Sequence, residues 1–326
     1  MQKQISIIVP IFNGEKHLVR CIDSIINQTF GIDRILLLLL NDGSSDSSIS
    51  IANSYAERFP NSIKVYSQKN MGTAKTRNKG VSLAKTKYIM FVDQDDFIDN
   101  DYCETFYRNA ESTGADVVAG GFRRTDSKKV FYTRRANDTI WYPFVHAEAW
   151  AKIHRTDFIK KIGAEFFDNV FGEDIPFTLQ ETLCTSNFKT IDYTGYNWFI
   201  NKKSITRTVH RDFSKLNLSS LLKKLGELDN SQLTEYYIFI VSLYAFIMSS
   251  VRINKKEFKK NLDEVFFEFK KIAPNFVDNK YIKDKVCGCP FNTYMVARIF
   301  YSFYQKGWYN LLYIINFVNT KRISKK

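Results

Sequence analysis

Three carboxylates, Asp93, Asp95 and Asp96, follow directly on an apolar run in the stretch KYIMFVDQDDFIDN. Carboxylates this close repel one another, and burial raises their pKa values. A divalent cation such as Mg²⁺ or Mn²⁺ would remove the repulsion, because it binds carboxylate oxygens and completes its shell with water and phosphate oxygens. The residue types and their spacing at a strand end therefore favour a metal site that holds a diphosphate.

Three other interpretations of this cluster compete with the metal site. An EF-hand loop starting at Asp93 would need a polar ligand and then a glycine where Phe97 and Ile98 stand, so it fails. A phosphatase of the haloacid dehalogenase type would use Asp93 as its nucleophile, although Phe97 replaces the usual Thr or Val. Carboxylates also favour helix N-termini, so a plain helix start stays open.

The elements that must position this cluster alternate between strand and helix patterns. Apolar runs bounded by turn residues predict strands, and apolar residues at helical spacing predict helices between them. The predicted strands are 5–12, 34–40, 63–68, 88–93 and 115–122, and the predicted helices are 15–28, 45–58, 73–84 and 101–112. This alternation predicts an α/β fold with a mostly parallel sheet covered by helices on both faces.

Three of the predicted strands end in polar segments. They are Pro10–Gly14 (PIFNG), Asn41–Asp46 (NDGSSD) and Asp93–Asp96 (DQDD). Ligands of such sheets bind beyond the carboxyl ends of the strands. We therefore expect the three segments to face one crevice.

The pattern is looser after Arg123 and becomes helical in the last third. The spacing predicts a helix over 146–163, a helix opening at the acidic pair in 171–186, and a strand pair over 187–201. Helical periodicity dominates from Lys215, with long segments at 254–273 and 291–319. We predict two domains, 1–213 and a mainly α-helical 214–326.

The net charge of +13 is concentrated in the last third, which carries 19 Lys/Arg against 9 Asp/Glu from Phe213 onward. A basic, aromatic region suggests an anionic partner such as a membrane surface, a phospholipid-linked substrate or nucleic acid. A solvated basic face is the plain alternative. Since no nucleic-acid-binding motif is present, we expect no nucleic-acid partner.

Two further features bear on location. The uncharged segment 236–251 is shorter than the roughly 20 residues that span a bilayer, so it predicts a buried core helix. The five scattered cysteines form neither a plausible disulfide framework nor a zinc site, which predicts reduced thiols and a cytoplasmic chain.

Four segments occur in a telling order: SIIVPIFNGEKHLVRCIDSIINQTF, NDGSSDSS, NMGTAKTRNKG and YIMFVDQDD. Together they resemble the nucleotide-sugar-dependent glycosyltransferases of family 2, which have the GT-A fold. The resemblance is dense over 5–101 and thinner at 149–159, 172–174 and 202–207. It implies inverting transfer of a sugar from a UDP-sugar to a hydroxyl of a glycan acceptor, in the synthesis of a cell-surface polysaccharide or glycoconjugate.

The resemblance assigns donor-binding roles at the ends of the first two strands. Asp42 matches the aspartate that accepts a hydrogen bond from the uracil ring N–H. Phe12 is placed to pack against uracil, with a core phenylalanine as the alternative. Pro10 and Asn13 flank it in the same segment.

The resemblance also assigns roles around the carboxylates. Arg77 matches an arginine near the nucleotide, while Asp93, next to Gln94, contacts the ribose or the metal shell. Asp95 is the first choice for direct coordination of Mn²⁺ or Mg²⁺, and Asp96 contacts the metal or the donor sugar. A later loop that closes over the diphosphate would supply Lys202, Arg207 and the metal ligand His210.

The chemical step needs a base, because an acceptor hydroxyl is a poor nucleophile until its proton leaves. Family 2 enzymes place this base as the Asp of an acidic pair at a helix start, which corresponds to Glu173–Asp174 here. Pro176 at an early helical position supports that geometry. Attack by the acceptor opposite the diphosphate would invert the anomeric centre.

The C-terminal segment 291–326 mixes aromatic residues with a basic end, as interfacial helices do. We predict that it contacts the inner face of the cell membrane, where lipid-linked glycans are built, or forms a homodimer interface. A core-packed helical cap is the alternative.

Overall fold

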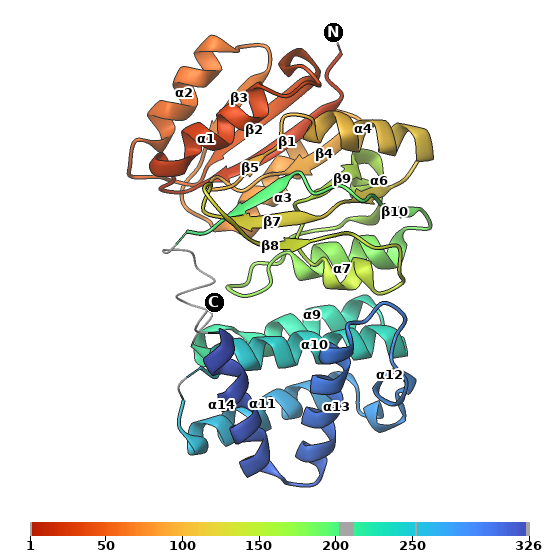
Figure 1. Cartoon of the computed structure of the whole chain (residues 1–326). Helices are drawn as coiled ribbons and strands as arrows, with labels where there is room; N and C mark the ends of the chain where they lie inside the picture. Colours follow the sequence, from red (N-terminus) through yellow and green to blue (C-terminus); the bar gives the residue numbers. More distant parts are fainter. Residues whose placement is uncertain (1, 202–211, 252, 324–326) are drawn as a thin grey trace. The chain divides into compact units, whose positions relative to one another are not determined.

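The computed structural model describes residues 2–201, 212–251 and 253–323, with the backbone alone for 318–323. The chain divides into two compact units (Figure 1). Unit 1 comprises Met1–Asp138, Val145–Asp168 and Phe177–Asn201, and unit 2 comprises Thr139–Phe144, Asn169–Pro176 and Lys202–Lys326. Two short segments that precede Phe213, Thr139–Phe144 and Asn169–Pro176, therefore belong to unit 2.

A seven-stranded sheet with the order β10-β6-β9-β4-β1-β2-β3 forms the centre of unit 1. Its neighbours pair in parallel except around β9, which is antiparallel to both β4 and β6. The strands are β1 (Ile5–Ile11), β2 (Ile35–Asn41), β3 (Ile63–Ser67), β4 (Tyr88–Phe91), β6 (Val117–Ala119), β9 (Lys152–Arg155) and β10 (Phe188–Thr190).

Helices cover both faces of this sheet. They are α1 (Glu15–Ile26), α2 (Ser48–Arg58), α3 (Thr73–Leu83), α4 (Tyr102–Thr113), α6 (Thr156–Ile162) and α7 (Ile175–Cys184). Two short helices, η1 (Ile32–Arg34) and α5 (Tyr142–Val145), lie between these elements in the sequence, and Tyr142–Phe144 of α5 belong to unit 2. Ile5, Ile7 and Val9 of β1 pack in one core with α1, α2 and α4. Ile8 points the other way and packs in a second core with α3, α6 and α7. Alternate residues of a strand face opposite sides, which explains why β1 and β2 are apolar throughout. The predicted fold class is confirmed.

A second, four-stranded sheet, in the order β5-β11-β7-β8, lies beside the carboxylate cluster in the sequence and in space. Its strands are β5 (Phe97–Ile98), β7 (Phe122–Thr125), β8 (Val130–Arg134) and β11 (Tyr196–Phe199). Because β5 begins one residue after Asp96 and pairs with β11, this sheet connects the cluster to the end of unit 1 at Asn201.

Two predictions for the second half are wrong. The segment 146–163 is not one helix: it contains the inner strand β9 before the short helix α6. The segment 187–201 does contain two strands, but β10 and β11 belong to different sheets and do not pair. Strand β9 was missed because Lys152 and His154, two polar residues, occupy fully buried positions in it.

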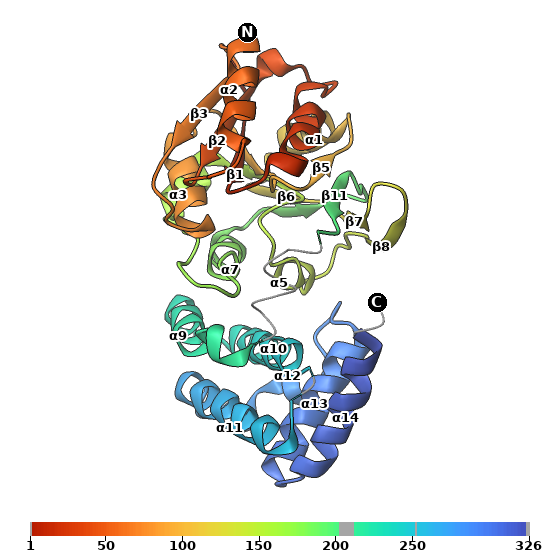
Figure 2. The ribbon, with the colours of Figure 1, turned by 90° about the vertical axis from the view of Figure 1, so that its left-hand side faces the viewer.

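Unit 2 is helical, as predicted (Figure 2). Its helices are α9 (Leu218–Leu228), α10 (Gln232–Ser249), α11 (Lys255–Ile272), α12 (Lys280–Lys283), α13 (Phe291–Gln305) and α14 (Tyr309–Ile323), with the short η3 (Phe213–Lys215) and η4 (Phe276–Asp278). The segment 291–319 is thus two helices, which separate at Gly307, a residue with φ +69°. Residues in the left-handed region end helices.

Helix α10 is the predicted buried core helix. Its Phe239 and Phe246 are fully buried, and their rings lie against those of Phe266, Phe269 and Phe258. Over 2–201, 212–251 and 253–323, no helix has both the length and the apolar character needed to cross a bilayer.

Candidate functional site

The carboxylate cluster forms a tight turn between β4 and β5. The backbone N–H of Asp96 donates to the carbonyl of Asp93 at 3.0 Å. The Asp96 side chain is buried and turns toward β11, where its oxygens accept from the Tyr196 hydroxyl and the Phe199 N–H, each at 2.7 Å. Burial, followed by the neighbouring Asp95 and Asp93, raises the pKa of Asp96 well above its usual value. This carboxylate therefore ties the turn to the second sheet.

Asp93 and Asp95 have different partners. A buried Arg77 donates from its guanidinium to Asp93 Oδ1 at 2.6 Å, and its positive charge lies over the ring of Phe166. Asn201 donates to Asp95 Oδ2 at 3.0 Å. Burial, and then the charge of Asp93, raises the pKa of Asp95. Two carboxylates are thus held close together, and the first of them is paired with the Arg77 guanidinium.

This donor set fits a hard divalent cation. Asp93 and Asp95 offer carboxylate oxygens, and a cation there would offset the burial and repulsion that raise the pKa of Asp95. In the part of the chain that the structure describes, no three or more His, Cys, Asp or Glu residues gather in a metal-binding group. One or two carboxylates are what Mg²⁺ needs when a substrate diphosphate completes its shell. The predicted ligand His210 lies outside the described residues.

The end of β1 forms a lip beside the cluster. The Gln94 side-chain amide pairs with the Phe12 backbone: Gln94 Oε1 accepts from the Phe12 N–H and Gln94 Nε2 donates to the Phe12 carbonyl, both at 2.9 Å. Asn13, at φ +50°, accepts from the Ser45 N–H through its side chain. Pro10 lies in register with Leu40 of β2. These contacts join the ends of β1, β2 and β4, as expected for three segments that face one crevice.

Phe12 is 47% exposed, so it is not a core residue. Asp42, in contrast, is buried, and its carboxylate accepts from the N–H groups of Met71 and Gly72, each at 2.9 Å, and from Gln68 at 2.8 Å. A carboxylate can accept about four hydrogen bonds, so these three leave room for one more. The same contacts bring the loop before α3, and with it Arg77, to the crevice.

One positioning residue in this crevice was missed from the sequence. Arg20 of α1 donates to the Asp95 carbonyl at 2.6 Å, and its guanidinium lies 3.9 Å from the ring centre of Phe199 and 4.7 Å from that of Phe97. It thus clasps the turn and the second sheet together. No signal in the helix 15–28 could reveal it, because its partners are distant in the sequence.

A buried charged network was also missed. Lys152 and His154 of β9 and Glu181 of α7 are fully buried. Lys152 Nζ lies 3.0 Å from Glu181 Oε1, and His154 Nδ1 lies 2.8 Å from Oε2. Burial alone would raise the pKa of Glu181, but Lys152 and His154 outweigh it and hold this pKa below its usual value. The alternation of Lys152 and His154 was the available signal for a strand.

The predicted acidic pair Glu173–Asp174 directly precedes α7, at Ile175, as expected. Gly172, at φ +68°, accepts from the Ile175 N–H through its carbonyl at 3.1 Å. The pair belongs to unit 2, and the carboxylate cluster belongs to unit 1. The predicted loop residues Lys202 and Arg207 lie outside the described residues.

Comparison with known proteins identifies the family. The family model "Glycosyl transferase family 2" matches residues 6–205. The chain is 30% identical over 229 residues to the "Uncharacterized glycosyltransferase EpsJ" of Bacillus subtilis, covering 64% of each protein. It is 28% identical over 307 residues to the "Cholesterol galactosyltransferase" of Borreliella burgdorferi, covering 83% of this chain and 84% of that protein.

A solved structure supports the GT-A fold. Staphylococcus aureus TarS 1–349, in complex with UDP-GlcNAc, matches with a TM-score of 0.66 at 16% identity, covering 93% of this chain and 92% of that one. None of these similarities supports the haloacid dehalogenase interpretation. The chain is therefore a transferase that belongs to glycosyl transferase family 2.

Proposed function

We propose that this protein is an inverting glycosyltransferase that moves a sugar from a UDP-sugar to a hydroxyl of a glycan acceptor, in the synthesis of a cell-surface polysaccharide or glycoconjugate. The observation that carries the proposal is the pair of carboxylates Asp93 and Asp95, held beside Arg77 at the carboxyl end of β4. It lies within the matched residues 6–205, and the similar TarS fold binds UDP-GlcNAc.

The donor would bind along the lip described above. The exposed ring of Phe12 offers a flat apolar face to uracil, and Asp42 retains acceptor capacity for a ring N–H. Pro10, Asn13 and Gln94 shape the backbone around Phe12. Arg77 holds Asp93 in place and adds positive charge near the nucleotide.

Asp95 and Asp93 would hold a Mn²⁺ or Mg²⁺ ion. When bound, the ion offsets the negative charge that develops on the departing UDP. Asn201 and Arg20 fix the side chain and the carbonyl of Asp95, respectively. Asp96, whose oxygens both accept hydrogen bonds from β11, would support the turn rather than lead the coordination. Lys202, Arg207 and His210 remain predicted contacts to the diphosphate and metal.

Asp174 would act as the general base that takes the proton of the acceptor hydroxyl. Such a base contributes roughly 10²–10⁴-fold to the rate. The beginning of α7 directly after Asp174 supports this assignment, because it fixes the residue at a helix start. A glycan or lipid-linked glycan acceptor would place the enzyme at the inner face of the membrane. The homodimer through the C-terminal helices stays a prediction.

The test separates donor binding from catalysis. UDP binding is measured by calorimetry with and without Mn²⁺, and transfer is measured with a panel of UDP-sugars. We expect Asp174→Asn to abolish transfer and leave UDP binding intact, while Glu173→Gln, the matched neighbour, keeps most of the activity. Asp95→Ala should remove the gain in UDP affinity that Mn²⁺ gives.

Two outcomes would overturn parts of this proposal. Wild-type transfer by Asp174→Asn would remove the base assignment. Absence of UDP binding by the wild-type protein in the presence of Mn²⁺ would remove the donor assignment altogether.

A further inference from the structure

Helix α14 in unit 2 carries exposed apolar side chains on its outer side. Leu312 and Asn316 are buried against the rest of the unit. Leu311, Ile314 and Phe317 lie on the opposite side of the helix and are exposed by 42–56%. These spacings place the three side chains on one face. Exposed apolar side chains gathered in this way mark an interaction surface.

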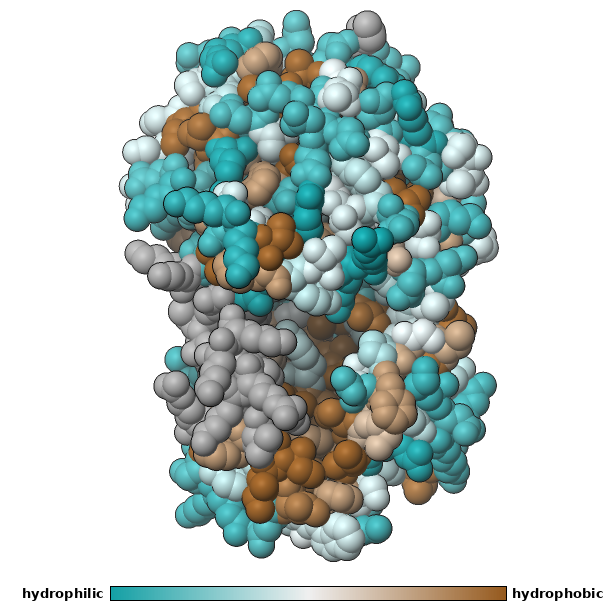
Figure 3. Space-filling view, viewed as in Figure 1, coloured by the Kyte–Doolittle hydropathy of each residue, from teal (hydrophilic) through white to brown (hydrophobic). Residues whose placement is uncertain are grey.

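The surface continues into the turn before α14. Trp308 is exposed, and the ammonium group of Lys306 lies 4.8 Å from its ring centre. Figure 3 shows hydrophobic surface gathered over the part of unit 2 where α14 lies. A tryptophan beside a lysine, next to an apolar helix face, suits the boundary between water and the acyl chains of a bilayer.

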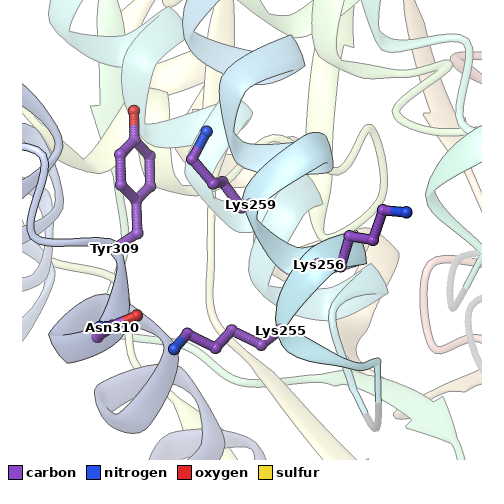
Figure 4. A pocket seen from close by; sticks show the side chains of 5 residues that line it. All are labelled: Lys255, Lys256, Lys259, Tyr309 and Asn310. Atoms are coloured by element: carbon purple, nitrogen blue, oxygen red, sulfur yellow. The ribbon is translucent and has the colours of Figure 1, made fainter.

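A basic pocket adjoins this helix. Lys255, Lys256 and Lys259 of α11, together with Tyr309 and Asn310 of α14, line a cavity of about 430 Å³. Figure 4 shows Lys255 reaching toward Asn310 and Lys259 lying alongside Tyr309, whereas Lys256 points away from the other two lysines. No carboxylate is among these lining residues.

The charges of this pocket are only partly compensated. Lys259 pairs with Asp263 at 3.1 Å, and its ammonium lies 4.7 Å from the Tyr309 ring centre. No ion pair of Lys255 or Lys256 occurs within the residues that the structure describes. The beginning of α11 therefore carries two positive charges next to α14, with Lys255 directed toward Asn310 and Lys256 directed away from the other two lysines. Such charges beside an apolar helix face are complementary to a phosphate-bearing lipid headgroup above acyl chains.

We propose that the outer face of α14, with Trp308 and the pocket of Lys255, Lys256 and Lys259, docks unit 2 on an anionic phospholipid bilayer. The apolar side chains enter the headgroup boundary, and the lysines contact lipid phosphates. This assigns the membrane contact to a defined surface. It is independent of the proposed UDP-sugar chemistry, since none of these residues belongs to the donor site.

The test measures binding of the full chain to vesicles by sedimentation. We expect binding to vesicles of two parts phosphatidylcholine and one part phosphatidylglycerol, weak binding to pure phosphatidylcholine, and loss of binding in high salt. The double substitution Lys255→Ala, Lys256→Ala should weaken binding on the order of tenfold or more. The matched pair Lys270→Ala, Lys271→Ala at the other end of α11 removes the same charge and should have little effect.

The apolar part has its own matched control. Phe317→Ser should weaken vesicle binding severalfold, whereas Phe267→Ser, at an even more exposed phenylalanine of α11, should not. Each variant must keep the wild-type helical content by circular dichroism and the wild-type thermal midpoint, which shows that unit 2 is folded. Equal weakening by both lysine pairs would reduce the effect to net charge and overturn the proposal. Loss of a dimer in Phe317→Ser, with no vesicle binding by the wild type, would show that a second copy covers this face.

Discussion

The two units of this protein differ in what they bury. Unit 1 contains all the fully or nearly buried charged side chains and histidines of the described chain: Asp42, Arg77, Asp96, Asp116, His146, Lys152, His154 and Glu181. Among the described residues of unit 2, the buried polar side chains are hydroxyls and amides, and the core is built from packed aromatic rings.

The difference shows which unit contains charged groups that add little to the free energy of unfolding. A buried charge is tolerated only when it is paired and hydrogen-bonded, so it fixes geometry but adds little net stability. In unit 1 such buried charges lie around the crevice and between β9 and α7. Unit 2 gains its stability from apolar area and places its charges outside, where they are available to a partner.

The largest effect on stability should come from breaking the buried network of unit 1. Replacing Lys152 with methionine keeps the length of the side chain but leaves the buried Glu181 without its lysine partner, hydrogen-bonded to the His154 ring. We expect a loss of about 3–5 kcal/mol in the free energy of unfolding, measured by urea denaturation. The double variant Lys152→Met, Glu181→Gln removes both charges and should recover at least half of the loss. If the loss in the free energy of unfolding of the double variant equals the sum of the losses of the two single variants, the charges are not coupled.

A smaller loss is expected from the core of unit 2. Phe258→Leu removes part of a ring that packs against Phe246 and Tyr313, and should cost roughly 1–2 kcal/mol. Because the described ring partners of Phe258 are aromatic side chains and not carboxylates or histidines, this loss should be the same at pH 5 and pH 8. A marked pH dependence would contradict the contrast between the two cores.

Replacing Asp96 should raise the free energy of unfolding, whereas the two preceding variants lower it. Its pKa is raised in the folded protein, so its protonated form favours folding and its contribution is lost as pH rises through the folded pKa. We expect Asp96→Asn to stabilise the metal-free protein at pH 7 by about 0.5–2 kcal/mol. The gain over wild type should shrink as the pH is lowered toward 4. A gain that persists unchanged at acid pH would exclude ionisation as its cause.

Glu181 responds to pH in the other direction. Its pKa is lowered in the folded state, so its contribution is present above the pKa of an unfolded glutamate and is lost as pH falls through the folded pKa. Acid should therefore weaken the β9–α7 network while it relieves the carboxylate turn. Measuring the free energy of unfolding of Glu181→Gln and of Asp96→Asn as a function of pH would separate the contribution of the β9–α7 network from that of the carboxylate turn.

The smallest effect is expected at an exposed ion pair of unit 1. Arg108 and Glu104 lie one helical turn apart on α4 at 2.5 Å, with Arg108 largely in solvent. Arg108→Gln should cost less than about 0.5 kcal/mol, because solvent and salt screen such pairs. A loss comparable with that of Lys152→Met would mean that burial is not what separates the two pairs.

The sequence predicts the residues that line the crevice better than the contacts that hold these residues in place. Strands β1, β2 and β4 are apolar runs that end in polar residues, and parallel strands bring such ends to one edge, so Phe12, Asp42 and Asp93 could be grouped in advance. The inward direction of the Asp96 side chain could not be predicted, because it depends on Tyr196, which is 100 residues away. The same holds for Arg20.

Strand β9 was missed for a different physical reason. Burial normally selects apolar side chains, and Lys152 and His154 violate this pattern because Glu181 of α7 compensates both. That compensation is visible only after the fold is known. In the C-terminal region, periodicity gave the helices, but it does not distinguish the inner face of α14 from an outer face that is also apolar.

The amide pair between Phe12 and Gln94 joins residues 82 positions apart. A growing polypeptide must therefore leave the ribosome past β4 before the lip of the crevice can form, although β1, β2 and the helix between them emerge much earlier. Until then the edge of β1 that pairs with β4 has no partner within the nascent chain. This edge is the place where we expect the newborn protein to depend most on chaperones.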